Sequence, residues 1–202
     1  MEKEKIVRIF DKQAKQYENR KEGSTLRQWR QKLLQDADGE VLELAVGAGA
    51  NFPFYPSGVK ITATDISPEM LKKAKQASKV HNLQTKFVLS DIEELEFADH
   101  SFDTIVSTLS LCCYENPLKV LNKLNSWCSP EGKILLMEHG ISSNIAYSTA
   151  QKVFDPLLYR FIGCHHARDM QDLLQKSGLT MIRVESYWMD TVKLIWAHPS
   201  RV

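Results

Sequence analysis

The fold of this chain is constrained most by residues 41–51, where an apolar run passes directly into a turn of small residues, V-L-E-L-A-V-G-A-G-A-N. Gly47 and Gly49 carry no β-carbon, so the main-chain N–H groups of this turn can approach a polar ligand. Further short apolar runs lie at 60–64, 87–89, 104–106 and 134–137. Helical patterns alternate with these runs. This rhythm predicts an α/β fold with a doubly wound, mostly parallel sheet that carries helices on both faces.

Helical and strand patterns also occupy the two ends of the chain. Residues 1–36 show two amphipathic helical patterns. Further helical patterns lie at 67–77, 116–128 and 170–176. The S-P-E-G segment at 129–132 is expected to end the second of these helices as a turn. Two last apolar runs, 181–187 and 192–197, are joined by a short turn and predict an antiparallel C-terminal hairpin.

Composition bounds the domain count and the class of partner. The 202 residues suffice for one core, so a single domain over residues 1–202 is predicted. The net charge of +1, from 26 basic and 25 acidic residues, argues against a nucleic-acid partner. Four cysteines without a C-x-x-C pair favour a reducing, cytoplasmic environment, and no apolar run has the length of a membrane span. Monomer and homodimer both stay open.

Two acidic residues join the glycine turn at the predicted edge of the sheet. Asp65 follows the second strand, 18 residues after Gly47, which is close to the spacing of an acid that binds ribose hydroxyls. Asp91 follows the third strand. A dinucleotide is disfavoured because Phe52 stands where its fingerprint needs a third glycine, and no lysine follows the glycines as in a phosphate loop. These features predict a site for a nucleoside cofactor.

These motifs resemble those of the class I S-adenosylmethionine-dependent methyltransferases, which share a Rossmann-like fold. In that family an acid stands on the first strand, here Glu43, and acids after the second and third strands contact ribose and adenine, here Asp65 and Asp91 with Ile92. The resemblance implies S-adenosylmethionine as cofactor and S-adenosylhomocysteine as product. Further cofactor contacts are implied at Gly47, Ala48, Gly49, Asn51, Ile66, Met70 and Thr108. Ala45 replaces the usual first glycine of the loop, which is tolerable if its φ is negative.

Several shorter motifs narrow the resemblance. G-A-N-F-P-F-Y-P at 49–56, T-L-S-L-C at 108–112, M-E-H at 137–139, F-D-P at 154–156 and G-C-H at 163–165 are similar to the microsomal alkyl-thiol methyltransferase-like proteins and the ubiquinone/menaquinone-type group. The first of these families carries a hydrophobic amino-terminal anchor. The first ten residues here lack a comparable apolar stretch, so no integral membrane segment is predicted.

The resemblance implies methyl transfer by in-line displacement to a small, apolar acceptor, with a thiol or a hydroxyl as nucleophile. Methylation of a quinone precursor or of a lipid amine is the alternative within enzymes. A cofactor-binding interaction module without turnover is the alternative from another class, and a nicotinamide oxidoreductase is a third reading.

Candidate residues for the acceptor end follow from their positions. His139 comes directly after the fifth strand and is the candidate general base for a hydroxyl acceptor. Tyr17, Cys112 and His165 are candidate substrate contacts. The apolar segment 141–166 is predicted to pack over the sheet edge as a substrate lid. No metal is predicted, because the adjacent residues Cys164-His165-His166 do not share one helical face and no second ligand cluster is evident in the sequence.

Overall fold

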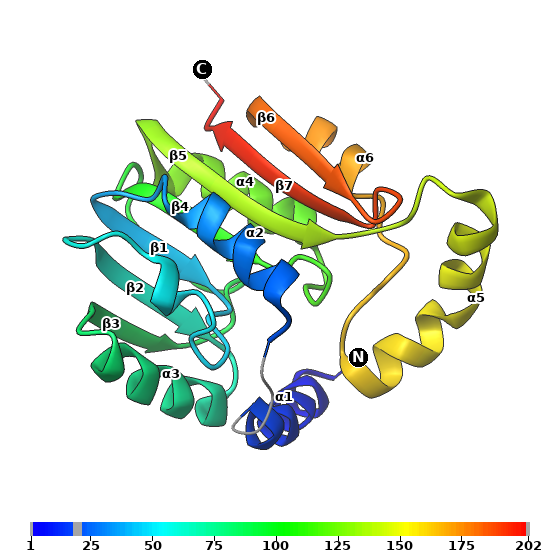
Figure 1. Cartoon of the computed structure of the whole chain (residues 1–202), viewed down its shortest axis with the longest axis horizontal. Helices are drawn as coiled ribbons and strands as arrows, with labels where there is room; N and C mark the ends of the chain where they lie inside the picture. The colour runs from blue at the N-terminus through cyan, green and yellow to red at the C-terminus, as the bar shows by residue number, and fades with distance from the viewer. Residues whose placement is uncertain (1, 18–21, 201–202) are drawn as a thin grey trace.

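A twisted sheet forms the centre of the molecule (Figure 1). The computed structural model describes residues 2–17 and 22–200, except for the side chain of Tyr17, and within them the sheet has seven strands in the order β3-β2-β1-β4-β5-β7-β6. The strands are β1 (Glu40–Leu44), β2 (Lys60–Asp65), β3 (Gln84–Leu89), β4 (Phe102–Thr108), β5 (Cys128–His139), β6 (Thr180–Tyr187) and β7 (Val192–His198). Strands β1 to β5 are parallel, and β7 pairs antiparallel with both β5 and β6. The predicted fold class is confirmed.

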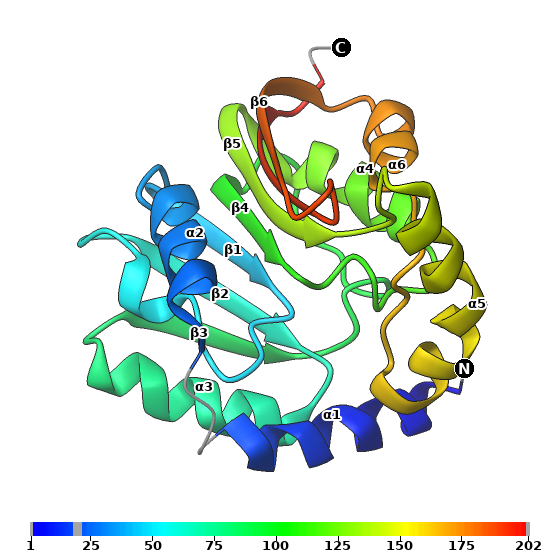
Figure 2. The same ribbon diagram turned by 45° about the vertical axis from the view of Figure 1, so that its right-hand side comes forward.

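Helices cover both faces of this sheet (Figures 1 and 2). The helix α2 (Ser24–Leu34), the short helix η1 (Phe52–Phe54) and α3 (Pro68–Val80) pack on one face, and α4 (Pro117–Trp127) and α6 (Met170–Lys176) pack on the other. Successive strand residues point to opposite faces, so Val41 joins the first core and Leu42 the second. This alternation explains why the central strands read as continuous apolar runs.

One predicted turn lies inside a strand. Residues 129–132 were expected to form a turn after α4, but β5 already begins at Cys128. The register between β4 and β5 shifts between Phe102, which faces Cys128, and Thr104, which faces Lys133. The extra residues are accommodated as an irregularity of the ladder, so the helix passes directly into the strand.

Two further helices border the end of the sheet at which the parallel strands finish (Figure 2). These are α1 (Lys3–Tyr17) and α5 (Ile145–Ile162). The side chain of Asp11 in α1 accepts a hydrogen bond of 2.6 Å from Ser67 Oγ at the start of α3, and Gln13 Nε2 donates to the carbonyl of Ile162 at 3.1 Å. The two helices therefore meet at the edge where Asp65 lies.

The apolar side chains of α5 are largely exposed. Val153, Phe154, Leu157 and Phe161 are each more than half exposed, so these four side chains do not pack on the sheet, and the role of segment 141–166 as a substrate lid stays a prediction. The buried residue of this helix is Gln151, whose amide bonds to Ser142 N, Gly140 O and His166 O. Hydrogen bonds rather than apolar contacts thus fix α5 to the body. Within the described ranges, no helix is long and apolar enough to cross a membrane.

Candidate active site

The turn after β1 has the backbone conformation that small residues permit. Ala45, Gly47 and Gly49 all have positive φ angles, of 45°, 56° and 85°. A β-carbon on Gly47 would meet no atom within 4 Å, whereas one on Gly49 would lie 2.7 Å from the ring of Phe52. Gly47 therefore faces open space and Gly49 allows close packing. The condition under which the methyl group of Ala45 is tolerable, a negative φ, is not met, so this methyl group is held in a left-handed turn at an energetic cost.

Asp65 closes the same turn from the end of β2. Its two carboxylate oxygens accept hydrogen bonds from Gly47 N and Ser67 N, both at 2.8 Å. Burial raises the pKa of Asp65 to about 6, against the effect of these hydrogen bonds. Asp91 follows β3, and its carboxylate lies 3.1 Å from Lys3 Nζ of α1.

A network of buried polar side chains is joined to the glycine turn through Asn51. Glu43 accepts hydrogen bonds from Asn51 Nδ2 at 2.8 Å and from Tyr55 OH at 2.9 Å. Arg30 Nη1 donates to Asn51 Oδ1 at 2.7 Å and to Thr108 Oγ1 at 2.9 Å. Burial raises the pKa of Glu43 to about 7, and the charge of Arg30 opposes this shift. The network ties α2, β1 and β4 to the glycine turn.

These groups border a cavity of about 890 Å³ at the carboxyl edge of the sheet. The predicted site residues that line it are Gly47, Ala48, Asn51, Asp65, Ile66, Met70, Asp91, Ile92, Thr108 and His139. Glu43, Gly49, Cys112 and His165 lie next to it without lining it. The prediction for the side chain of Tyr17 falls outside the described residues.

Comparison with known proteins places this geometry in a family. A family model described as a methyltransferase domain matches residues 42–136. The chain is 33% identical over 162 residues to thiol S-methyltransferase TMT1B of Homo sapiens, covering 76% of this chain and 66% of that protein. It is 30% identical over 119 residues to the ubiquinone/menaquinone biosynthesis C-methyltransferase UbiE of Bdellovibrio bacteriovorus, covering 55% of this chain and 51% of that protein. The structure of a SAM-dependent methyltransferase from Aquifex aeolicus superposes with a TM-score of 0.66 at 16% identity, covering 94% of this chain and 98% of that chain.

The chain belongs to the class I S-adenosylmethionine-dependent methyltransferases. It spans less than two thirds of the thiol S-methyltransferases that it matches, 66% of the human protein and 62% of its Rattus norvegicus counterpart.

The cavity of this methyltransferase fits the cofactor of its family. Gly47 leaves an open cradle beside main-chain N–H groups, and Asp65 places a buried carboxylate next to it. Met70 and Ile92 add buried apolar side chains to the lining of the same cavity. A polar cradle, two acids and an apolar slot are the groups that a positively charged nucleoside requires.

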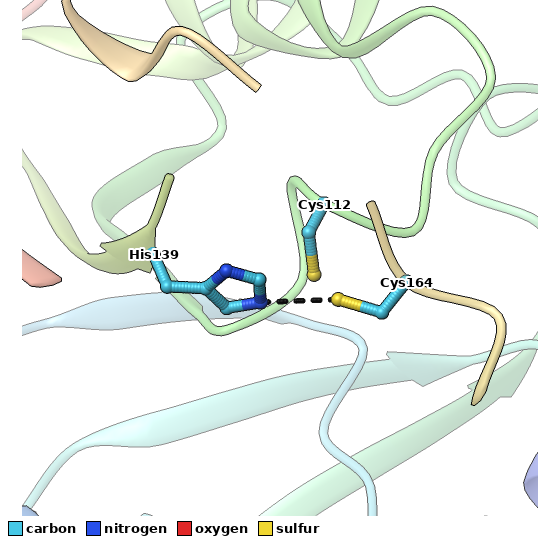
Figure 3. Close-up of side chains that lie close together, drawn as sticks. All are labelled: Cys112, His139 and Cys164. Carbon is cyan, nitrogen blue, oxygen red and sulfur yellow. Dashed lines mark hydrogen bonds between the residues drawn. The ribbon is translucent and has the colours of Figure 1, made fainter. Parts of the chain in front are cut away.

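The opposite end of the cavity is built around sulfur and imidazole groups (Figure 3). His139 Nε2 lies 3.0 Å from Cys164 Sγ, and the Cys112 thiol points toward the same place. Burial lowers the pKa of His139 to about 4, and the neighbouring His166 adds to this effect. His165 turns away from the cavity, because its Nδ1 bonds to Asp155 at 2.7 Å.

Sequence reasoning missed several groups of the site. The position of Arg30 could have been used to predict its role. Arg30 stands beside Trp29 on the apolar face of a helix, and a charged side chain is buried there only when it has a polar partner. Cys113 and Tyr159 line the cavity without any local pattern that marks them, and Cys164, quoted above only within a shared motif and for a metal, lines it too.

Proposed function

We propose that this methyltransferase transfers the methyl group of S-adenosylmethionine to the thiol of a small, apolar acceptor. The observation that carries the proposal is the extent of the cavity, from Gly47 at one end to His139 and Cys164 at the other. The side chains of Ile6 and Phe10 from α1 border this space, as do Tyr159 and Ile162 from α5. Its volume of about 890 Å³ lies in the upper part of the usual range for ligand pockets, which suits a cofactor together with an acceptor. Similarity to thiol S-methyltransferases supports a sulfur nucleophile.

The residues of the chain act mainly by positioning. When bound, the cofactor supplies a methyl group on a sulfonium ion, and transfer to the acceptor sulfur is an in-line displacement. Gly47, Asp65 and Asp91 hold the nucleoside, while Glu43 and Arg30 keep the turn in place through Asn51. Holding the reactants in attack geometry lowers such a barrier by about 7–11 kcal/mol.

The predicted general base is not required in this proposal. A free thiol has a pKa of about 8.5, so a useful fraction ionises near neutral pH without a strong base. His139 Nε2 faces Cys164 Sγ, which favours a role with that sulfur over proton transfer from a hydroxyl.

We also propose the compartment of the reaction and the class of its acceptor. All four cysteines, which lie in the described part of the chain, are free, and this supports a reducing compartment such as the cytoplasm. The net charge of +1 supports a small-molecule acceptor over a nucleic acid.

Calorimetric titration with S-adenosylmethionine and S-adenosylhomocysteine tests the cofactor site. We expect micromolar binding that Asp65→Ala weakens about 10–100-fold, the effect of losing a charged hydrogen-bond acceptor. Asp172→Ala, in the exposed part of α6, is the matched control and is expected to bind like the wild type.

The acceptor is then sought among alkyl and aryl thiols and the alcohols of the same shape, with thioether products detected by mass spectrometry. Thioether formation from the thiols supports the proposal. Absence of cofactor binding, or products from alcohols or amines alone, would refute it.

A further inference from the structure

Three side chains converge beside the acceptor end of the cavity (Figure 3). Cys112 Sγ, His139 Nε2 and Cys164 Sγ all lie within 4.8 Å of one another. They come from the loop after β4, the end of β5 and the segment after α5. Two thiols and an imidazole are a donor set that soft and borderline metal ions, above all Zn²⁺, select.

The distances suit one ion. Zinc bonds of about 2.3 Å to sulfur and 2.0–2.1 Å to nitrogen, in tetrahedral geometry, separate ligand atoms by about 3.5–3.8 Å. His139 Nε2 and Cys164 Sγ are already 3.0 Å apart, and the other pairs lie within 4.8 Å. The present separations thus lie on both sides of the tetrahedral values, so only small shifts of the side chains are needed for all three atoms to bind one ion.

The backbone around the three residues is held in place. Buried Glu138 accepts hydrogen bonds from Ser110 N and Leu111 N, which fixes the loop that carries Cys112. The carbonyl of Cys112 accepts from His165 N at 3.0 Å and from Arg168 Nε at 3.3 Å. The loop of Cys112 and the segment of Cys164 are thus tied to each other, as a preformed site requires.

A second histidine adds to the polar character of this place. The ring of His166 stacks on that of His139 with centroids 4.7 Å apart. Its Nε2 is buried and, among the residues that the structure describes, has no hydrogen-bond partner. A buried, unpaired nitrogen at a sulfur-rich cavity wall is unusual in a purely structural core.

We propose that Cys112, His139 and Cys164 bind a Zn²⁺ ion whose fourth coordination position opens onto the cavity. His139 and Cys164 line the cavity, so an ion held by them faces it. Cys113 also lines the cavity, and its Sγ is 3.5 Å from Cys112 Sγ, but it lies outside the set of three that share one centre. Three protein ligands with an open position are typical of catalytic rather than structural zinc.

The open position allows the ion to bind the acceptor, and this role rests on the proposed function. An acceptor thiol bound there loses its proton to solvent and coordinates as a thiolate. Its electron pair forms the new bond to the methyl carbon. The pair of the breaking carbon–sulfur bond stays on the cofactor sulfur, and zinc changes neither charge nor oxidation state.

Metal content of the purified protein tests the site. After incubation with zinc under reducing conditions and dialysis, we expect about one zinc per chain, and less than about a tenth of that in Cys112→Ala, His139→Ala and Cys164→Ala. Cys128→Ala removes a buried thiol elsewhere, beside Lys133, and is expected to keep its zinc. A wild type without zinc, or an equal loss in Cys128→Ala, would overturn the inference.

Cobalt substitution keeps the test independent of whether the variants fold. The wild type loaded with Co²⁺ is expected to show thiolate-to-cobalt charge-transfer absorption and intense tetrahedral bands. Hexanethiol without S-adenosylmethionine is expected to change these bands, whereas hexanol is not. A spectrum without thiolate ligation overturns the site, and a spectrum indifferent to hexanethiol overturns the open position.

The two proposals fail separately. Thiol methylation at full rate by the zinc-free wild type would overturn the role of the ion in methylation and leave the proposed function standing. A thiol-sensitive cobalt spectrum without methylation of any thiol would overturn the proposed function and support the metal site.

Discussion

The two ends of the cavity are built from different chemistry. At the cofactor end, Arg30, Asn51 and Glu43 form a network of charged and amide groups in which the hydrogen bonds are short and buried. At the acceptor end, sulfur and imidazole groups such as Cys164 and His139 line the cavity. The helix beside them, α5, leaves most of its apolar side chains exposed.

This difference between the two ends indicates which substitutions should affect stability most. A fully satisfied buried network specifies one arrangement of the glycine turn, because each unpaired partner would be costly. At the acceptor end, Glu138 holds the loop of Cys112, and α5 is joined to the body through hydrogen bonds of Gln151 and Asp155, while its apolar side chains stay exposed. Substitutions should therefore affect stability strongly at the first end and weakly along α5.

The largest effect is expected from Arg30→Met. It leaves the Glu22 carboxylate and the Asn51 amide without the guanidinium that binds them, so the free energy of unfolding should fall by about 3–5 kcal/mol. Arg160→Met, on the exposed surface of α5, is the matched control with an expected change within about 0.5 kcal/mol. Urea denaturation measures both, and equal losses would remove the distinction between the two ends.

A pH series on Glu43→Gln sharpens the electrostatic side of the comparison. Because the pKa of Glu43 is raised from 4.5 to about 7, the folded state favours the protonated acid. This contribution is complete below about pH 4.5 and is lost as the pH rises through about 7. Relative to the variant, the wild type should lose at most about 1.4 kcal/mol of stability per pH unit in this window and nothing above it. A constant difference in urea denaturation across the series would contradict the buried, protonated carboxyl.

A smaller effect of opposite sign is expected at the turn itself. Ala45→Gly removes the β-carbon from a residue with φ of 45° and should stabilise the fold by about 1 kcal/mol or less. Ala48→Gly, in the same turn but without positive φ, should instead destabilise by about 0.4–1 kcal/mol. Thermal unfolding of the two variants separates backbone strain from a general effect of glycine.

The smallest effect is expected from Leu157→Ala in α5. This side chain is 54% exposed, so the free energy of unfolding should change by no more than about 0.5 kcal/mol. Leu33→Ala, in the buried face of α2, should cost about 2–5 kcal/mol. A large loss at Leu157 would show that α5 packs more tightly than its exposure indicates.

Much of the cofactor end could be predicted from the chain itself. Gly47 lies in the turn after β1, Asp65 ends β2 and Asp91 follows β3 closely, and parallel neighbouring strands bring their carboxyl ends to one edge. Local signals, namely short continuous apolar runs and a small-residue turn, therefore sufficed to place these groups together. The sign of φ at Ala45 stayed open in the sequence, because a residue type alone does not determine it.

The acceptor end could be decided only by the tertiary structure. Cys112, His139 and Cys164 belong to three segments far apart in the sequence, and their spacing along the chain does not predict that they lie together. Arg30 enters the network from a helix that precedes the sheet. The sequence by itself determined the sheet, its order of elements and the cofactor edge, because turn chemistry and periodicity act between chain neighbours. Which distant side chains share a site depends on how whole helices and loops pack, and that is settled only when the chain is folded.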